Sequence, residues 1–156
     1  MFVSKLTPRR AREIFTLRAE LESYAVRLAV EREAYTPAEV RLQDQALYEL
    51  EEAVLRGEPF ELAECDMRLH ELLARGSDHQ LLLETLASLR LRMRQAIVYT
   101  KLMDSDVEPE GTTHRRLLHL VRSGSPAQAA SAVHEHITQA GQLLLKKLSL
   151  VENGRA

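Results

Sequence analysis

Residues 62–73 read L-A-E-C-D-M-R-L-H-E-L-L, and the rest of the chain is organised around this stretch. Its leucines recur at helical spacing, which predicts a helix with one side facing a core. Asp66 and His70 fall on that same side, one turn apart, because side chains at positions i and i+4 stack on one face of a helix. A carboxylate and an imidazole that point into a core are costly unless they have partners. The stretch therefore predicts a polar site inside a helical protein.

The composition is typical of one folded, all-α domain. The chain has 156 residues, of which 45% are hydrophobic, and it contains only 6 glycines and 5 prolines. A content of 28% charged residues with a net charge of −2 argues against general disorder. The near-neutral balance also argues against nucleic-acid binding by this chain alone, since gripping phosphates needs a concentrated basic surface.

The single cysteine, Cys65, excludes a disulfide within the chain and fits a reducing cytoplasm. No apolar run reaches the length of a membrane span, and no signal-peptide pattern is present. The expected location is therefore the cytoplasm, with no membrane partner.

Capping patterns divide the chain into six helices. Thr7-Pro8 and Ser125-Pro126 place a capping residue before a proline at the first helical position, and Thr36–Glu39 is a capping box. The expected helices cover about 8–33, 37–56, 59–75, 80–101, 112–122 and 126–148, and the longest loop covers 103–111. Short loops between such helices predict an antiparallel bundle.

Two further histidines lie on the inward side of their helices. His114 shares a face with Leu117 and Leu118, and His136 shares a face with Val133. The other three histidines outside residues 62–73 do not: His119 falls on a polar side, His134 points away from His136, and His79 precedes a helix. Periodicity thus selects four inward polar groups from three helices, namely Asp66, His70, His114 and His136.

Three imidazoles and one carboxylate suit a divalent transition metal. Zn²⁺ fits this donor set best, and Ni²⁺ or Mn²⁺ also fit. Without a metal, the same four groups must form a buried network in which each finds its own partner. With a metal, the carboxylate offsets part of the cation's charge and the imidazoles stay neutral. The interpretation as a metal site is favoured, and the buried network stays open.

Arg18 lies in the predicted inward stripe of the first helix, between Ile14, Leu17 and Leu21. An inward arginine needs a partner, and two are open: an ion pair with Glu22 one turn on, or an anion in a cavity. A metal with one carboxylate ligand keeps net positive charge. If Arg18 or Arg94 reaches the same cavity, the site would trap a small carboxylate.

At this point the sequence resembles a known family. D-M-R-L-H at Asp66–His70 resembles the D-x-x-F-H motif of the C-terminal effector domain, of FadR-like (FCD) type, of GntR-family transcription regulators. The later histidine motifs of the family resemble two segments of this sequence, Thr113–Ala130 and the H-E-H-I of His134–Ile137. The L-R-x-x-L-E motif at the start of the family's domain resembles Leu17–Glu22. The resemblance runs from about residue 7 to residue 145.

The resemblance implies a bundle of six or seven helices. It implies that Asp66, His70, His114 and His136 are the metal ligands and that the effector is a small organic acid. Arg18 matches an arginine of the family's first helix, and Arg90 and Arg94 are looser matches for effector contacts. Four departures leave the ligand set intact: Leu69 for the usual Phe, Thr113 for Glu, His79 for Asn and Ser125 for Asp.

The resemblance also suggests a domain organisation. Residues 1–6 resemble the end of a linker that follows a winged helix-turn-helix domain. Residues 7–149 are expected to form the effector-binding bundle, and residues 150–156 are expected to form a flexible tail. The expected protein is a ligand-sensing and oligomerisation domain of a bacterial regulator, forming a homodimer. It is expected to reach operator DNA only through the missing N-terminal domain.

Two rival functions remain open. The first is a small, hydrolase-like metalloenzyme that uses the same ligands. No H-E-x-x-H motif is present, no glutamate sits beside the ligands as a general base, and neither a serine nor Cys65 has a nucleophile's surroundings. The sequence therefore predicts that the protein is not an enzyme. The second rival is a structural bundle without metal.

Overall fold

The computed structural model of the protein describes residues 6–102 and 110–153. The helices are α1 (Pro8–Glu31), α2 (Pro37–Arg56), α3 (Pro59–Arg75), α4 (Gln80–Leu102), α5 (Glu110–Ser123) and α6 (Pro126–Asn153). These two stretches contain no strand, so the prediction of an all-α fold is confirmed.

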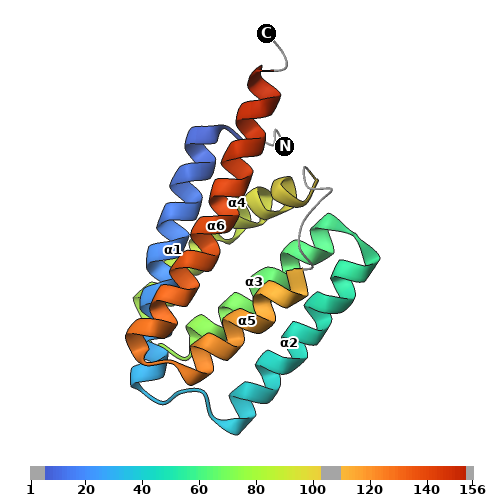
Figure 1. Cartoon of the computed structure of the whole chain (residues 1–156). Coiled ribbons are helices and arrows are strands. Elements are labelled where there is room, and N and C mark those ends of the chain that lie inside the picture. Colours follow the sequence, from blue (N-terminus) through green and yellow to red (C-terminus); the bar gives the residue numbers. More distant parts are fainter. Residues whose placement is uncertain (1–5, 103–109, 154–156) are drawn as a thin grey trace.

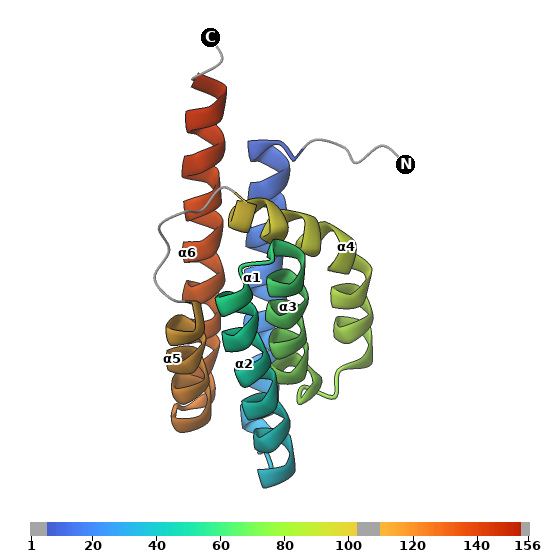
Figure 2. The same cartoon turned by 90° about the vertical axis from the view of Figure 1, so that its right-hand side faces the viewer.

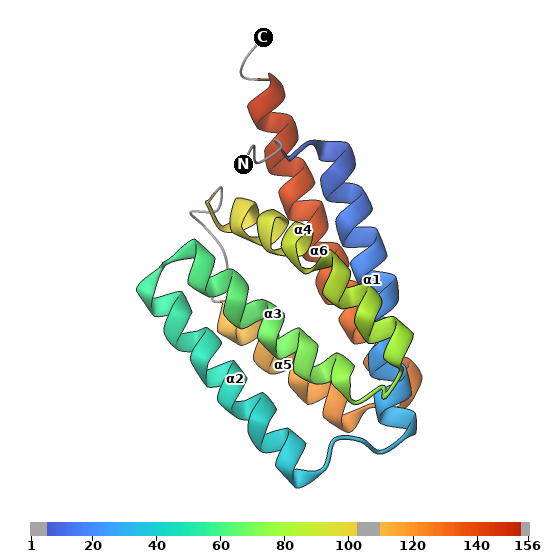
Figure 3. The same cartoon turned by 180° about the vertical axis from the view of Figure 1, so that it is seen from behind.

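The helices form a bundle in which α1 and α6 share the largest interface (Figure 1). They run antiparallel, so that the start of α1 and the end of α6 lie at the same end of the molecule. Helix α3 packs on α1, α2 and α4, while α5 packs on α2 and α6. Figure 2 and Figure 3 show α4 as a curved helix on the outer side of α3 and α1. Helix α3 therefore lies inside the bundle, which places Asp66 and His70 within reach of several helices.

The helices begin where the sequence supplies caps. The side chains of Thr7 and Thr36 accept hydrogen bonds from the backbone N–H of Arg10 and Glu39, at 3.2 and 3.3 Å. Ser125 and Gln128 form a reciprocal pair, in which each side chain accepts from the other's backbone N–H. These local bonds explain why the expected starts of α1, α2 and α6 agree with the structure.

Some expected boundaries and faces differ. Helix α6 continues to Asn153 rather than ending near 148, and α5 begins at Glu110, two residues early. The expected linker 1–6, loop 103–111 and tail 150–156 fall partly or wholly outside the described residues. Leu17 was expected in the inward stripe, yet 44% of it is exposed, whereas Phe15 is buried. The reason is that α1 packs on four helices, α3, α4, α5 and α6. Its buried side is therefore wider than the single apolar stripe expected from the sequence, and it faces a different direction.

No helix in the described part of the chain is both long and apolar enough to span a membrane.

Gly141 on α6 permits the close approach of α1. A Cβ atom at this position would lie 2.7 Å from Cβ and 2.8 Å from Cγ of Phe15, and these atoms cannot move without the backbone of α1. We expect Gly141→Ala to destabilise the protein by about 1–3 kcal/mol, although alanine is the better helix former. Urea unfolding measures this, with Ser131→Ala at an exposed position of α6 as the control. A stabilised Gly141→Ala variant would contradict the close packing.

Candidate metal centre and ligand cavity

The four predicted metal ligands lie together in the structure. Asp66 and His70 come from α3, His114 from α5 and His136 from α6, and each offers one donor atom such that all four atoms lie within 4.8 Å of one another. Asp66, His70 and His114 are buried, and His136 is partly buried. Because zinc–ligand bonds are about 2.0–2.2 Å long, small side-chain rotations suffice to bring such a group around one cation.

The three imidazole rings contact one another. The ring of His136 lies 4.5 Å from that of His114 and 5.3 Å from that of His70, measured between centroids. The rings of His70 and His114 meet edge to face at 5.6 Å. Protonated rings this close repel one another, and for His136 this repulsion adds to burial in lowering the pKa, so its lone pair is available to a cation.

Asp66 holds two helices to α3. Its Oδ1 lies 3.0 Å from Nε2 of His114, and its Oδ2 accepts a hydrogen bond of 3.2 Å from the Arg18 guanidinium. Burial by itself raises the pKa of Asp66, but the charge of Arg18 and the contacts with His70 and His114 outweigh it and hold the pKa well below its usual range. Asp66 is therefore an ionised carboxylate inside the bundle.

Arg18 forms an ion pair with Glu22, one of the two alternatives that the sequence left open, in addition to its bond with Asp66. Its Nε lies 2.6 Å from Oε1 of Glu22, and only 4% of Arg18 is exposed. Burial opposes charge on both residues, yet their mutual attraction, together with Asp66 and His70, raises the pKa of Arg18 and lowers that of Glu22. One guanidinium and two carboxylates leave this group with one net negative charge when the imidazoles are neutral, which favours a cation.

Nδ1 of His70 lies 2.6 Å from Oε2 of Glu22. Sequence reasoning missed this contact, since it considered Glu22 only as a partner of Arg18. The available signal was that Glu22 lies four residues after Arg18 on the same inward side of the first helix. Nε2 of His70 is buried and has no hydrogen-bond partner among the described residues. An orphaned acceptor of this kind, at the centre of a donor cluster, fits a metal ligand.

A cavity of about 220 Å³, lined by both polar and apolar side chains, borders the cluster directly. Three of the four candidate ligands line it (Asp66, His114 and His136), and so does Arg18. Its remaining polar lining is Thr100, Lys101, Thr113 and Gln139. These four residues were not predicted from the sequence. A signal was available for Thr100 and Lys101, which lie one turn after the inward Ile97. A small polar molecule in this cavity would contact the cluster itself.

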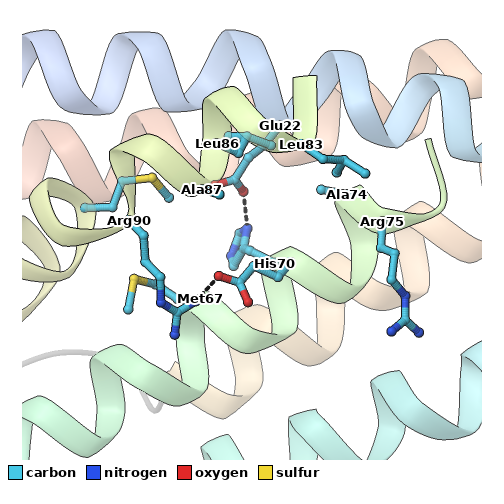
Figure 4. Close-up of a pocket in the computed structure, with 11 residues that line it drawn as sticks. Glu22, Met67, His70, Ala74, Arg75, Leu83, Leu86, Ala87 and Arg90 are labelled. Carbon is cyan, nitrogen blue, oxygen red and sulfur yellow. Dashed lines mark hydrogen bonds and ion pairs between the residues drawn. The ribbon is translucent and has the colours of Figure 1, made fainter. Parts of the chain in front are cut away.

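A second cavity, of about 310 Å³, lies between α1, α3 and α4 and is mainly apolar (Figure 4). It reaches only His70 of the four candidate ligands, together with Glu22. Arg90 lines it and is paired with Glu71 and Glu64. Arg94 pairs with Glu64 at 3.3 Å and lines neither cavity. The structure thus brings Arg18 to the cluster, but it places Arg90 and Arg94 on the α4 side.

The pKa shifts predict a pH-dependent stability of the metal-free protein. Burial, and then the neighbouring His114 and His70, lower the pKa of His136, so the unfolded chain binds its proton more tightly. Stability should fall by up to about 1.4 kcal/mol per pH unit as the pH drops below about 6.5. The lowered pKa values of Asp66 and Glu22 add a second loss below about pH 4, where the unfolded carboxylates take up protons.

Urea unfolding between pH 5 and 8, in a chelator, measures the first of these losses. The variant His136→Gln should show a flatter dependence than the wild type, whereas His134→Gln, whose ring is 43% exposed, should not. Identical slopes in the wild type and His136→Gln would contradict a neutral, buried His136.

The chain matches a known protein family over most of its length. The profile of the FCD domain family matches residues 13–139, which include all four candidate ligands and Arg18. No curated protein matches the sequence. FCD domains are ligand-binding domains of GntR-family transcription regulators and are not an enzyme family. The chain belongs to the FCD domain family, the C-terminal ligand-binding domains of GntR-family regulators.

Proposed function

We propose that this domain senses a small organic acid at a divalent metal ion held by Asp66, His70, His114 and His136. The observation that carries the proposal is the position of this cluster. It groups four donor atoms within 4.8 Å, includes one orphaned imidazole nitrogen and opens into a cavity that Arg18 also lines. Zinc suits three imidazoles and one carboxylate best, and nickel or manganese also fit.

The charge of the loaded site supports a carboxylate as the effector. The metal-free group carries one net negative charge, so a divalent cation makes it positive by one. When bound, the cation supplies Lewis-acid attraction for an oxygen anion. Arg18, whose charge is already part of this sum, lines the same cavity. A cavity of about 220 Å³ fits a small acid rather than a large cofactor.

The effector contacts proposed for the arginines differ with their positions. Arg18 would act through its charge, since its guanidinium is already bonded to Glu22 and Asp66. Arg90 and Arg94 remain predictions, and a ligand that reached Arg90 would have to occupy the apolar cavity.

Signalling would pass through the helices that meet at the site. The cluster joins α3, α5 and α6, and Arg18 adds α1. An effector that binds one packing arrangement of these four helices more tightly than another would shift the population toward that arrangement. We propose that the domain works in a homodimeric bacterial regulator in the cytoplasm. There, the shift would reach operator DNA through a separate DNA-binding domain.

Titration of small carboxylic acids tests the proposal. Isothermal calorimetry on zinc-loaded protein, with acetate, lactate, malate, citrate and gluconate as probes, should find at least one acid that binds. The same acid should not bind protein kept in a chelator, and the matching amide should bind neither form. An acid that binds equally well with and without metal would contradict a metal-centred effector site.

A further inference from the structure

The bond between Glu22 and His70 links the first helix to the candidate metal centre. Figure 4 shows Glu22 and His70 pointing toward each other across the space between α1 and α3. Nδ1 of His70 and Oε2 of Glu22 are 2.6 Å apart, and each residue is only 3% exposed. A contact this short between buried groups leaves no room for water, so each atom's role in the hydrogen bond is fixed by the other.

The chemistry of the pair decides which nitrogen of His70 carries the proton. The guanidinium of Arg18 donates to the other oxygen of Glu22 at 2.6 Å, which favours the ionised carboxylate. An ionised carboxylate only accepts hydrogen bonds, so Nδ1 of His70 must be the donor. A neutral imidazole carries one N–H, which leaves the lone pair on Nε2. That nitrogen is the buried atom without a partner.

The ring contacts show where this lone pair is available. Nδ1 of the His70 ring contacts Glu22, while the rings of His114 and His136 lie 5.6 and 5.3 Å from the same ring, measured between centroids. The edge that carries Nδ1 is occupied by Glu22, so Nε2 is the atom left to serve the cluster. Both the tautomer and the orientation of the ring therefore follow from Glu22.

We infer that Glu22 is a positioning residue, which selects the tautomer of His70 so that Nε2 becomes a metal donor. This inference rests on the proposed metal function and deepens it. Carboxylates that accept from the second nitrogen of a ligating histidine fix its ring and increase its basicity. Here the carboxylate is held by Arg18, which also bonds Asp66, so one arginine orders two of the four candidate ligands.

A purely structural role for Glu22 is the competing explanation. Glu22 also neutralises a buried arginine, and its loss would destabilise the bundle even if His70 took no part. The two explanations differ in one observable. Only a positioning role makes the protonated nitrogen of His70 depend on residue 22.

Nitrogen-15 NMR of the metal-free wild-type protein at pH 8 tests this without any substitution. Long-range proton–nitrogen spectra distinguish a protonated ring nitrogen from one that carries a lone pair. For His70 we expect protonated Nδ1 and unprotonated Nε2. The opposite tautomer, or an equal mixture of the two, would overturn the inference.

Variants then connect the tautomer to metal affinity. Glu22→Leu removes the acceptor, and we expect a mixed tautomer and zinc affinity about 10- to 100-fold weaker, measured by competition with a chelator. Glu22→Gln keeps only one acceptor oxygen, and the Arg18 guanidinium claims it, so the amide NH2 would face Nδ1 of His70 as a donor. We therefore expect the proton of His70 to move to Nε2 and the affinity for zinc to fall. If Glu22→Leu does not fold, the wild type and Glu22→Gln still decide the matter.

The matched control is Glu20→Leu. Glu20 lies on the same helix and contacts a histidine of α6, His134, at 3.1 Å, but both side chains are exposed by 43% or more. This variant should change neither the tautomer of His70 nor the affinity for zinc. Unchanged zinc affinity in folded Glu22→Leu would overturn the positioning role. Absence of zinc binding by the wild type would instead overturn the proposed metal function, while the tautomer is still read in the metal-free protein.

Discussion

Replacement of Asp66 by alanine is expected to destabilise the metal-free protein by about 3–5 kcal/mol, because it breaks a buried ion pair. Asp66 is 5% exposed and satisfies the guanidinium of Arg18 with one oxygen and His114 with the other. Its loss leaves a buried positive charge with Glu22 as its single remaining carboxylate contact among the described residues. For a chain of this size, the melting temperature should fall by about 6–20 °C.

The same substitution should abolish stabilisation by zinc, since the one carboxylate donor of the cluster is removed. Thermal unfolding, followed by circular dichroism with and without Zn²⁺, measures both effects. Asp44→Ala is the matched control, because Asp44 pairs with Arg122 at 2.8 Å but is 57% exposed. A loss below about 1 kcal/mol is expected there. Equal losses in the two variants would show that the buried network contributes no more than a surface pair.

Zinc should raise the melting temperature of the wild-type protein by about 8–16 °C when its free concentration is about 1,000 times the dissociation constant. At that ratio, mass action stabilises the folded protein by about 4.1 kcal/mol. Each kcal/mol of stabilisation raises the melting temperature of a chain of this length by about 2–4 °C. The physical source is that the folded protein groups four donors that lie far apart in the unfolded chain.

A pair of histidine variants shows whether this shift comes from the cluster. His136→Ala removes one donor and should lose most of the zinc-induced shift, whereas His134→Ala, two residues away on α6, should keep it. A chelator should return the wild type to its metal-free melting temperature. A wild-type protein that zinc does not stabilise would favour the structural bundle, in which the four polar groups satisfy one another.

The helices could be predicted from the sequence because their signals are local. Proline at the first helical position and a capping side chain act within one turn, so Thr7, Thr36 and Ser125 fix helix starts wherever the helices pack. The inward sides of α3, α5 and α6 were also predictable, since each helix buries one stripe. Helix α1 was the exception, because it packs on four helices and no single stripe describes its buried side.

The sequence by itself identified five polar residues that face inward, because helical periodicity decides the side on which a residue lies: Asp66, His70, His114, His136 and Arg18. It did not identify the buried Gln43 and Thr100. It could not determine which of the five meet, since contacts between helices depend on packing over 22 or more residues of separation. Only the tertiary structure gave Glu22 two partners, Arg18 and His70, and placed the cavity that Arg18 lines beside the cluster rather than beside Arg90. The physical reason is that a buried charge selects its partner by distance in the folded chain, which no local pattern encodes.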